Sequence, residues 1–307
     1  MDEMNPDHAE EALGDQIDDA VPSRGYRMLP VVGLGGSAGS IEAVGEFLEG
    51  MPTDTGMAFV VVLYLPAAHE NALAQVLARS TRMRVVPVGG RERIEPDTVY
   101  VVPPGKTLRM RGELIELAAL PPGQGRHMAV DFFFRTLADT HGPHAIAVVL
   151  SGVDSDGTIG VKRIKERGGL TVSQDPEQAI HGSMPRSAIS TGMIDWVLPV
   201  REMGARIHAY YRIERQLKLP PEQLPDGGDD DAPPAPDVDE AAFREVLAFV
   251  RSRSGRDFVN YKRATVLRRI GRRMQVNGVS DLAAYLDCLR TRPGEAGALL
   301  QDMLISD

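Results

Sequence analysis

The stretch VVGLGGSAGS, from Val31 to Ser40, decides the fold class of the first two thirds of the chain. It is an apolar run that ends in four glycines placed around one serine. The helical pattern SIEAVGEFLEG follows in residues 40–50, and the apolar run AFVVVLY comes next in residues 58–64. A strand, a tight turn, a helix and a second strand are typical of the opening of an α/β sheet. The turn could either hold a phosphate or present Ser37 as a nucleophile.

The spacing of the glycines does not fit nucleotide binding. A dinucleotide site needs G-x-G-x-x-G and an acidic residue at the end of the next strand. Here Gly33, Gly35 and Gly39 give G-x-G-x-x-x-G, and the next strand ends at Tyr64 and Leu65. The G-K-[ST] step of a P-loop is also missing. A phosphate site is therefore disfavoured.

The same residues do fit G-x-S-x-G, with Ser37 between Gly35 and Gly39. At a strand-to-helix junction this pattern lifts a serine hydroxyl above the sheet edge, where helix amides can stabilise an oxyanion. The alternative is a tight turn in which Ser37 only caps the following helix. The motif by itself leaves both interpretations open, because short glycine patterns occur often by chance.

Strands and helices continue to alternate as far as residue 218. Residues 108–117 interrupt this rhythm with two short strands about a turn at Arg111 and Gly112. We therefore predict an α/β fold, a doubly wound and mostly parallel sheet with a β-hairpin insertion, followed by a small all-α domain. The expected parts are a disordered acidic leader in residues 1–26, the α/β domain in 27–218, a disordered linker in 219–239 and the helical domain in 240–307.

Composition restricts the classes of function. The chain has 307 residues, a net charge of -9 and one cysteine, Cys288. The acidic balance argues against nucleic-acid binding, and one cysteine excludes internal disulfides and multi-cysteine zinc sites. The leader lacks a signal-peptide pattern, and no apolar run reaches the roughly 18 to 20 residues of a bilayer span. We expect a cytoplasmic protein without membrane insertion, metal or cofactor.

A second informative stretch is VVLSGVDSDGTIGVKRI, in residues 148–164. Asp154 and Asp156 come just after a buried strand, so they belong to the sheet edge at which Ser37 also emerges. A serine nucleophile needs a base and a carboxylate that orients it. The alternative role for these two residues is helix capping, which we expect for one of them.

Four motifs in order give the first resemblance to a known family. They are VVGLGGSAGSIEAV (31–44), VYVVPPGKTL (99–108), VVLSGVDSDGTIGVKRIKERGGLTVSQDP (148–176) and MPRSAISTGMIDWVLPV (184–200). Together they resemble the catalytic domain of the bacterial chemotaxis protein-glutamate methylesterase. The resemblance implies that Ser37 is the nucleophile, that Asp156 is the triad aspartate, and that the reaction is hydrolysis of glutamyl methyl esters on receptors.

The resemblance fails at the catalytic histidine, which the family places in a Gln-His pair after the second strand. Leu63 and Tyr64 stand there instead. A phenol keeps its proton at neutral pH, so it is a poor general base. His69 and His181 are the possible substitutes. The alternative role for His69 is a helix-start residue, and His181 lies in a loop that the resemblance places near the active site. We expect surface positions or places outside the site for the others, His8, His127, His141, His144 and His208.

Three further residues belong to the turn and to the oxyanion environment that the family implies. They are Gly36, Ala38 and Val153. Ala38 stands where many single-domain relatives have threonine, and Val153 with Asp154 replaces a Met-Gly step. Both differences could change the surroundings of an oxyanion.

The C-terminal part resembles a different family. The stretch YKRATVLRRIGRRM, in residues 261–274, is similar to the N-terminal helical subdomain of the chemotaxis receptor glutamate methyltransferase. Its arginines Arg268, Arg269, Arg272 and Arg273 are spaced to form one basic helical stripe, suited to acidic receptor helices or simply solvated. No S-adenosylmethionine lobe follows within the chain, so we expect no methyl transfer from it.

Two hypotheses remain open from the sequence. The first is a methylesterase domain of an esterase-methyltransferase fusion, impaired by Tyr64 and acting on a methylated chemoreceptor or similar signalling protein. The second keeps the fold but not the chemistry, as a catalytically inactive regulatory or docking module of a larger sensory protein. Intact Ser37 and Asp156 favour the first, and Tyr64 favours the second.

Overall fold

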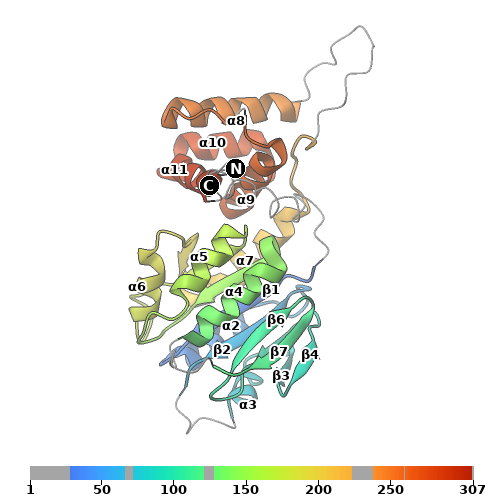
Figure 1. Ribbon diagram of the computed structural model, residues 1–307, viewed down its shortest axis with the longest axis vertical. Helices are drawn as coiled ribbons and strands as arrows, with labels where there is room; N and C mark the ends of the chain where they lie inside the picture. Colours follow the sequence, from blue (N-terminus) through green and yellow to red (C-terminus); the bar gives the residue numbers. More distant parts are fainter. Residues whose placement is uncertain (1–27, 66–71, 121–127, 223–237, 259, 306–307) are drawn as a thin grey trace, which may run out of the picture. The chain divides into compact units, whose positions relative to one another are not determined.

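The computed structural model describes residues 28–65, 72–120, 128–222, 238–258 and 260–305 (Figure 1). These residues fall into two compact units, which divide between His208 and Ala209. The division lies inside helix α7 (Val200–Glu214), ten residues before the boundary expected at residue 218. The predicted leader in 1–26 and most of the predicted linker lie outside the described residues.

The first unit contains a seven-stranded sheet in the order β10-β9-β8-β1-β2-β5-β3, with every neighbouring pair parallel. The strands are β1 (Val31–Gly36), β2 (Ala58–Leu63), β3 (Arg84–Pro87), β5 (Thr98–Val101), β8 (Ala145–Val149), β9 (Leu170–Gln174) and β10 (Trp196–Leu198). The chain moves outward from β1 in one direction and then returns to β8 on the other side, so the order reverses between β1 and β8. This confirms the doubly wound parallel sheet, and it places a topological switch point beside the end of β1.

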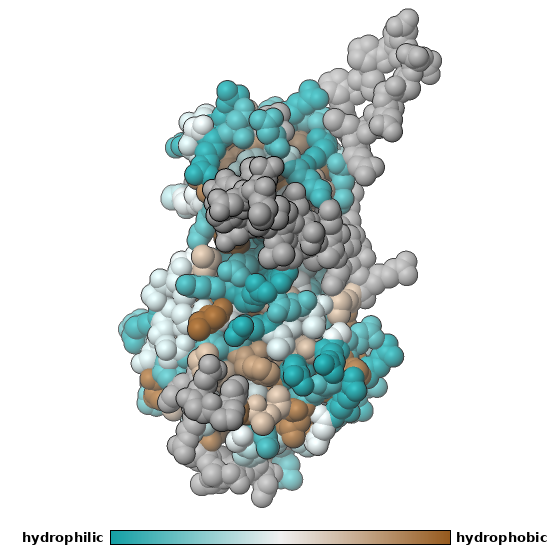
Figure 2. Space-filling view, in the orientation of Figure 1, coloured by the Kyte–Doolittle hydropathy of each residue, from teal (hydrophilic) through white to brown (hydrophobic). Residues whose placement is uncertain are grey.

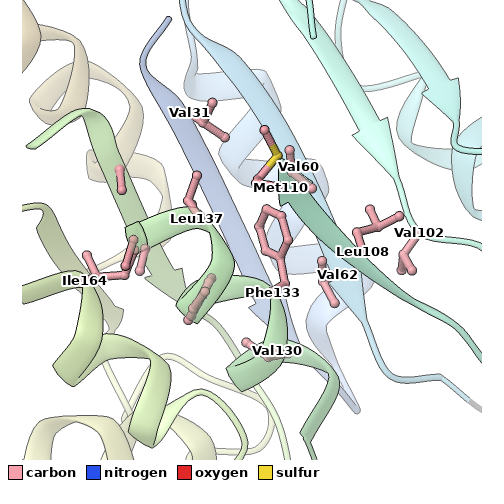
Figure 3. Close-up of a cluster of buried hydrophobic side chains, with 14 of the residues drawn as sticks. Val31, Val60, Val62, Val102, Leu108, Met110, Val130, Phe133, Leu137 and Ile164 are labelled. Atoms are coloured by element: carbon pink, nitrogen blue, oxygen red, sulfur yellow. The ribbon is translucent and has the colours of Figure 1, made fainter. Parts of the chain in front are cut away.

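Alternate strand residues point to opposite faces of the sheet. Because the central strands are buried at every position, both faces are apolar and are covered by helices. The helices of this unit are α2 (Ser40–Gly50), α3 (Leu73–Leu77), α4 (Ala129–His141), α5 (Thr158–Glu166), α6 (Ser183–Ser190) and the first part of α7, with a short 3-10 helix, η3 (Gly142–His144). Phe133 of α4 packs with Val60 and Val62 of β2 in one buried cluster (Figure 3). Phe59, which directly precedes Val60 and so points to the opposite face, instead meets Phe47 of α2 with ring centroids 6.2 Å apart. Thus α4 covers one face of the sheet and α2 covers the other.

The predicted hairpin is present and belongs to a second sheet. Strands β6 (Thr107–Arg111) and β7 (Leu114–Ala118) pair antiparallel, and β4 (Arg91–Arg93) adds to β7 to give the order β4-β7-β6. Leu108 and Met110 of β6 join the cluster around Phe133, and the Met110 amide donates to Thr136 Oγ1 of α4 at 3.0 Å. Helix α4 is therefore packed between the two sheets (Figures 1 and 3).

The second unit contains the predicted helices. They are α8 (Val238–Ser254), α9 (Arg263–Asn277), α10 (Leu282–Thr291) and α11 (Glu295–Leu304), which share one apolar core. Leu219 is 7% exposed and packs in this core, while the Lys218 amide donates to the Ser280 carbonyl at 2.8 Å. The prediction that a linker begins at residue 219 is therefore wrong for Leu219, whose apolar side chain is buried with the helices.

Polar and apolar surfaces are distributed unevenly in Figure 2. Hydrophilic residues predominate on the visible face of the helices α8 to α11, and apolar residues appear as small separate patches on the α/β unit. No helix among the described residues has the length and apolar character that a membrane span needs.

Candidate active site

Ser37 lies at the switch point of the sheet, one residue after β1 ends at Gly36. Its amide donates to the Ser151 carbonyl at 3.0 Å, which joins the turn to the segment that follows the neighbouring strand β8. Its own carbonyl accepts from the Ser40 amide at 3.2 Å and from the Ser40 hydroxyl, so the turn leads directly into α2. Ser37 is 2% exposed, and its position is fixed from both sides.

The Ser37 hydroxyl is in contact with a backbone donor. Its Oγ accepts a hydrogen bond from the Val153 amide at 3.1 Å. Among the residues that the structure describes, this is the only hydrogen bond that Oγ receives or gives. A fixed amide beside a nucleophilic oxygen is the kind of donor that stabilises negative charge in acyl transfer. The structure thus brings together Ser37 and Val153, two residues selected from the sequence.

The other selected turn residues act through their main chain. The Gly36 carbonyl accepts from the Tyr64 amide at 3.0 Å, and the Ala38 carbonyl accepts from the Ser151 hydroxyl at 2.8 Å. Tyr64, at the position of the family histidine, therefore lies beside the serine turn, one residue after β2 ends. The sequence resemblance expects a base at this position, but the side chain there is a phenol.

Asp156 is held by amides of another helix. Its Oδ2 accepts from the Val130 amide at 2.9 Å, and its Oδ1 accepts from the amides of Asp131 and Gly157, both at 2.8 Å. The residue is 4% exposed. Burial raises the pKa of this carboxyl to about 7, and the nearby charges of Asp131 and Asp154 add to the rise, although the amides oppose it. Both carboxyl oxygens of Asp156 therefore accept hydrogen bonds from backbone amides.

Asp154 and Asp131 form a cluster of three carboxyl side chains with Asp156. Asp154 Oδ1 accepts from the Asp156 amide at 2.9 Å, which fixes the local turn before α5. Asp131 lies in the first turn of α4, and its Oδ1 accepts from the Gly160 amide of α5 at 2.6 Å. Burial also raises the pKa of Asp131. The expected capping aspartate is thus Asp156, but it caps α4 and not the α5 helix that follows it.

The two candidate substitute bases are placed differently. His69 lies outside the described residues, as do His8 and His127. His181 is exposed, its carbonyl accepts from the Gly152 amide at 2.9 Å, and its amide donates to Ser151 Oγ at 2.9 Å. Its main chain is therefore next to the segment that holds Ser37. Within the described part of the chain, its ring makes no hydrogen bond to the serine.

The remaining histidines lie away from Ser37. His141 ends α4 and His144 ends the 3-10 helix just before β8, so both are at the opposite edge of the sheet from the end of β1. Both are buried, which makes the expected surface positions wrong. Burial lowers the pKa of His141 to about 4. His208 lies in α7.

No metal centre is indicated in the described ranges, where no group of three or more His, Cys, Asp or Glu side chains could hold an ion. The contact shown for the Ser37 hydroxyl is with a backbone amide donor, an arrangement that acyl transfer through serine uses.

The predicted basic stripe in the helical unit is not a surface stripe. Three of its arginines are almost fully buried, with exposed fractions of 3% for Arg269, 4% for Arg272 and 6% for Arg273. Arg272 pairs with Asp302 at 2.6 Å, and Arg273 pairs with Glu295 at 2.7 Å. The charges of Arg272 and Arg273 are neutralised inside the unit, and Arg269 is buried with them, so a stripe exposed to a receptor is wrong for these three. Arg268 is half-buried in the same helix.

Sequence reasoning did not select two residues that shape the site, Ser151 and Asp131. Asp131 could have been noticed as an acid in the first turn of a helix, a usual position for a charge that stabilises the helix N-terminus. Ser151 carries no comparable signal, because its partners come from segments distant in the sequence.

A doubly wound sheet that holds a serine hydroxyl against a backbone amide at its switch point has the architecture of an α/β serine hydrolase. Comparison with known families makes this specific. Residues 32–207 match the CheB methylesterase family, and the chain belongs to that family. Residues 241–304 match the all-alpha domain of CheR methyltransferase. Both resemblances seen in the sequence are confirmed.

Individual relatives agree with this assignment. The chain is 34% identical over 181 residues to a protein-glutamate methylesterase/protein-glutamine glutaminase of Dechloromonas aromatica, covering 58% of this chain and 51% of that protein. It is 32% identical over 179 residues to the protein-glutamate methylesterase FrzG of Myxococcus xanthus, covering 58% and 54%. An uncharacterized 104.1 kDa protein of Rhodobacter capsulatus is 39% identical over 245 residues, covering 76% of this chain and 25% of that protein. The chain thus spans about half or less of these relatives.

A solved structure supports the fold. The CheB methylesterase catalytic domain of Thermotoga maritima superposes with a TM-score of 0.54 at 25% identity. The match covers 59% of this chain and 98% of that domain.

Proposed function

We propose that this chain contains a chemotaxis-type protein-glutamate methylesterase domain that hydrolyses glutamyl methyl esters on receptors with impaired turnover. The observation that carries the proposal is the 3.1 Å hydrogen bond from the Val153 amide to Ser37 Oγ at the switch point of the sheet. The partner is a methylated chemoreceptor or a similar signalling protein, and no cofactor takes part.

In this proposal Ser37 Oγ attacks the ester carbonyl and forms an acyl-serine. The hydroxyl proton goes to the methoxy group, which leaves as methanol, and water then releases the glutamate carboxyl and restores the serine. The Val153 amide transfers its hydrogen bond to the oxyanion of the tetrahedral intermediate. The residue directly after β2 is Tyr64, so no imidazole stands at that expected place to move the proton. Slow turnover is the expected consequence.

A second function is an inactive regulatory or docking module with the same fold. Asp156 favours it, because both oxygens of its carboxyl accept backbone amides and its pKa of about 7 leaves it partly uncharged at neutral pH. A partly neutral carboxyl is a weak partner for an imidazolium. In this alternative Ser37 only shapes the turn.

The decisive experiment restores the base. Methanol release from methylated receptor is measured for the wild-type protein, for Tyr64→His, and for Tyr64→His with Leu63→Gln. A general base contributes about 10²–10⁴-fold, so we expect a gain of about 100-fold or more. Ser37→Ala should abolish the gain, and Tyr64→Phe is the matched control that should not produce it. A folded Tyr64→His protein that does not exceed the wild-type rate would favour the docking module.

A further inference from the structure

Ser151 joins the serine turn to two other segments. It is fully buried just after β8, and its carbonyl accepts the Ser37 amide at 3.0 Å. Its hydroxyl donates to the Ala38 carbonyl at 2.8 Å and accepts from the His181 amide at 2.9 Å. The His181 carbonyl also lies 3.3 Å from this Oγ. Because a hydroxyl has one proton, the nearer Ala38 carbonyl takes it.

The main chain of Ser151 is itself fixed by the next strand. Its amide donates to Oε1 of Gln174 at 2.9 Å, and Gln174 ends β9 with 3% exposure. All polar groups of Ser151 therefore have partners, and these partners belong to three segments distant in the sequence. A hydroxyl held in this way has little freedom to rotate.

The turn is shaped to admit this hydroxyl. Gly39 has φ 76, in the left-handed region, and a Cβ at this position would lie 2.8 Å from Ser151 Oγ. Any larger residue would be strained and would also push the two segments apart. The last glycine of G-x-S-x-G thus serves the contact between Ala38 and Ser151 as well as the turn itself.

The segment after Ser151 contains the donor to the nucleophile. The Gly152 amide is held by the His181 carbonyl at 2.9 Å, and the next amide, that of Val153, reaches Ser37 Oγ. We infer that Ser151 is a positioning residue, whose hydroxyl clamps the Ala38 and His181 segments so that Ser37 Oγ meets the Val153 amide. The inference rests on the proposed role of Ser37 as nucleophile, but its test does not need turnover.

The test measures amide hydrogen exchange by NMR in the full chain. Variant Ser37→Ala removes the acceptor and defines the unprotected rate of the Val153 amide. A hydrogen bond worth about 1 kcal/mol protects an amide roughly five- to tenfold. We expect Ser151→Ala to speed exchange at Val153 by this factor, and to leave the amide of Val148, inside β8, unchanged. Ser173→Ala is the matched control, because Ser173 is equally buried in β9 and its hydroxyl bonds only the Gln174 carbonyl.

Two results would overturn the inference. One is a Val153 amide that stays protected in Ser151→Ala, and the other is a wild-type Val153 amide that exchanges as fast as in Ser37→Ala. A second readout uses the Tyr64→His background, in which Ser151→Ala should lower kcat about tenfold while KM stays the same. If that background shows no turnover, the proposed reaction fails, and the exchange data still decide the role of Ser151.

Discussion

Asp131 and Asp156 cap the N-termini of each other's helices. Asp156, just before α5, accepts the Val130 and Asp131 amides of α4, and Asp131 accepts the Gly160 amide of α5. Each carboxyl thus satisfies donors that a helix cannot satisfy within itself. Asp156, the proposed triad aspartate, thus also links two helices that lie side by side in Figure 1.

Because Asp156 is buried in this mutual capping of α4 and α5, we expect the stability of the α/β unit to depend on pH. The pKa of Asp156 is about 7 in the folded chain against an ordinary value of 3.8, so folding takes up a proton between these pH values. A raised carboxyl pKa contributes stability at low pH that is lost as pH rises from about 4 to about 7, by up to about 4 kcal/mol at about 1.4 kcal/mol per unit. We expect the free energy of unfolding of wild type relative to Asp156→Asn to decrease over this range.

The single tryptophan, Trp196, lies in β10 and reports the unfolding of this unit alone. Urea titrations followed by its fluorescence at pH 4, 5.5, 7 and 8 give the difference between wild type and variant. Asp139→Asn is the control, because Asp139 is a half-exposed carboxyl of α4 that pairs with Arg163 at 2.9 Å. A difference between wild type and Asp156→Asn that increases with pH would contradict the assignment.

Close packing of α4 on α5 gives a second prediction. A Cβ on Gly160 would lie 2.5 Å from the Cβ of Phe134, which neither backbone can accommodate without moving. Overpacking of this kind costs about 1–3 kcal/mol, so Gly160→Ala should lower the urea midpoint read from Trp196. Apart from its chain neighbours and the backbone of its own helix, Gly297 of α11 has no atom of the described residues within 4 Å of its Cβ position. Gly297→Ala should stabilise its helix by about 0.5–1 kcal/mol, the opposite sign, read from the reactivity of the buried Cys288 in the same unit, and equal effects of both changes would refute the packing argument.

The sequence was sufficient for the sheet and for the serine turn because these depend on local patterns. Apolar runs, glycines and helix stops identified β1, α2 and the hairpin, and G-x-S-x-G identified Ser37. Strand β4 was not predicted, because the three residues RER have no apolar alternation and pair only through β7. Pairing with a distant strand leaves no local trace.

Charged residues show even more clearly that a local sequence pattern does not reveal contacts with distant segments. The spacing of the arginines in α9 indicated one helical stripe, but not whether it faces water. Burial of Arg273 depends on Glu295, which lies 22 residues later in the chain. Likewise, the pattern could indicate that Asp156 caps a helix, but not that this helix is α4, whose capped amides lie 25 and 26 residues earlier. The roles of both side chains follow from tertiary contacts.

The buried ion pairs of the helical unit give a third prediction. Arg273 donates to both oxygens of Glu295, at 2.9 and 2.7 Å, and the Tyr285 hydroxyl donates to the same carboxylate at 2.9 Å. Removing one partner of a buried pair leaves an uncompensated charge and costs about 3–5 kcal/mol. Arg273→Met should therefore destabilise this unit strongly, and adding Glu295→Gln should recover part of the loss.

The only cysteine, Cys288, is buried in α10 and reports this unit by its reaction with a thiol reagent. The urea concentration at which the thiol becomes reactive gives the midpoint. Arg290→Ala is the control, because Arg290 faces Glu245 at 3.8 Å in an exposed pair that contributes at most about 1 kcal/mol. If Arg273→Met lowered the stability of the unit no more than Arg290→Ala, the buried pair of Arg273 and Glu295 would not be needed for its stability.

The last prediction concerns the identity of the base in the wild-type protein. His181 is exposed and contacts the site through its main chain, and among the described residues its imidazole makes no hydrogen bond to Ser37. We expect His181→Ala to change the methylesterase rate of wild type by less than about twofold, since the triad argument requires an imidazole at the serine oxygen. His69→Ala is tested in parallel, with His208→Ala in α7 as the matched control for loss of an imidazole. Robust wild-type turnover that survives Tyr64→Phe but decreases by about 100-fold or more in His69→Ala or His181→Ala would identify a relocated base. Such a result would overturn the view that Tyr64 impairs the site.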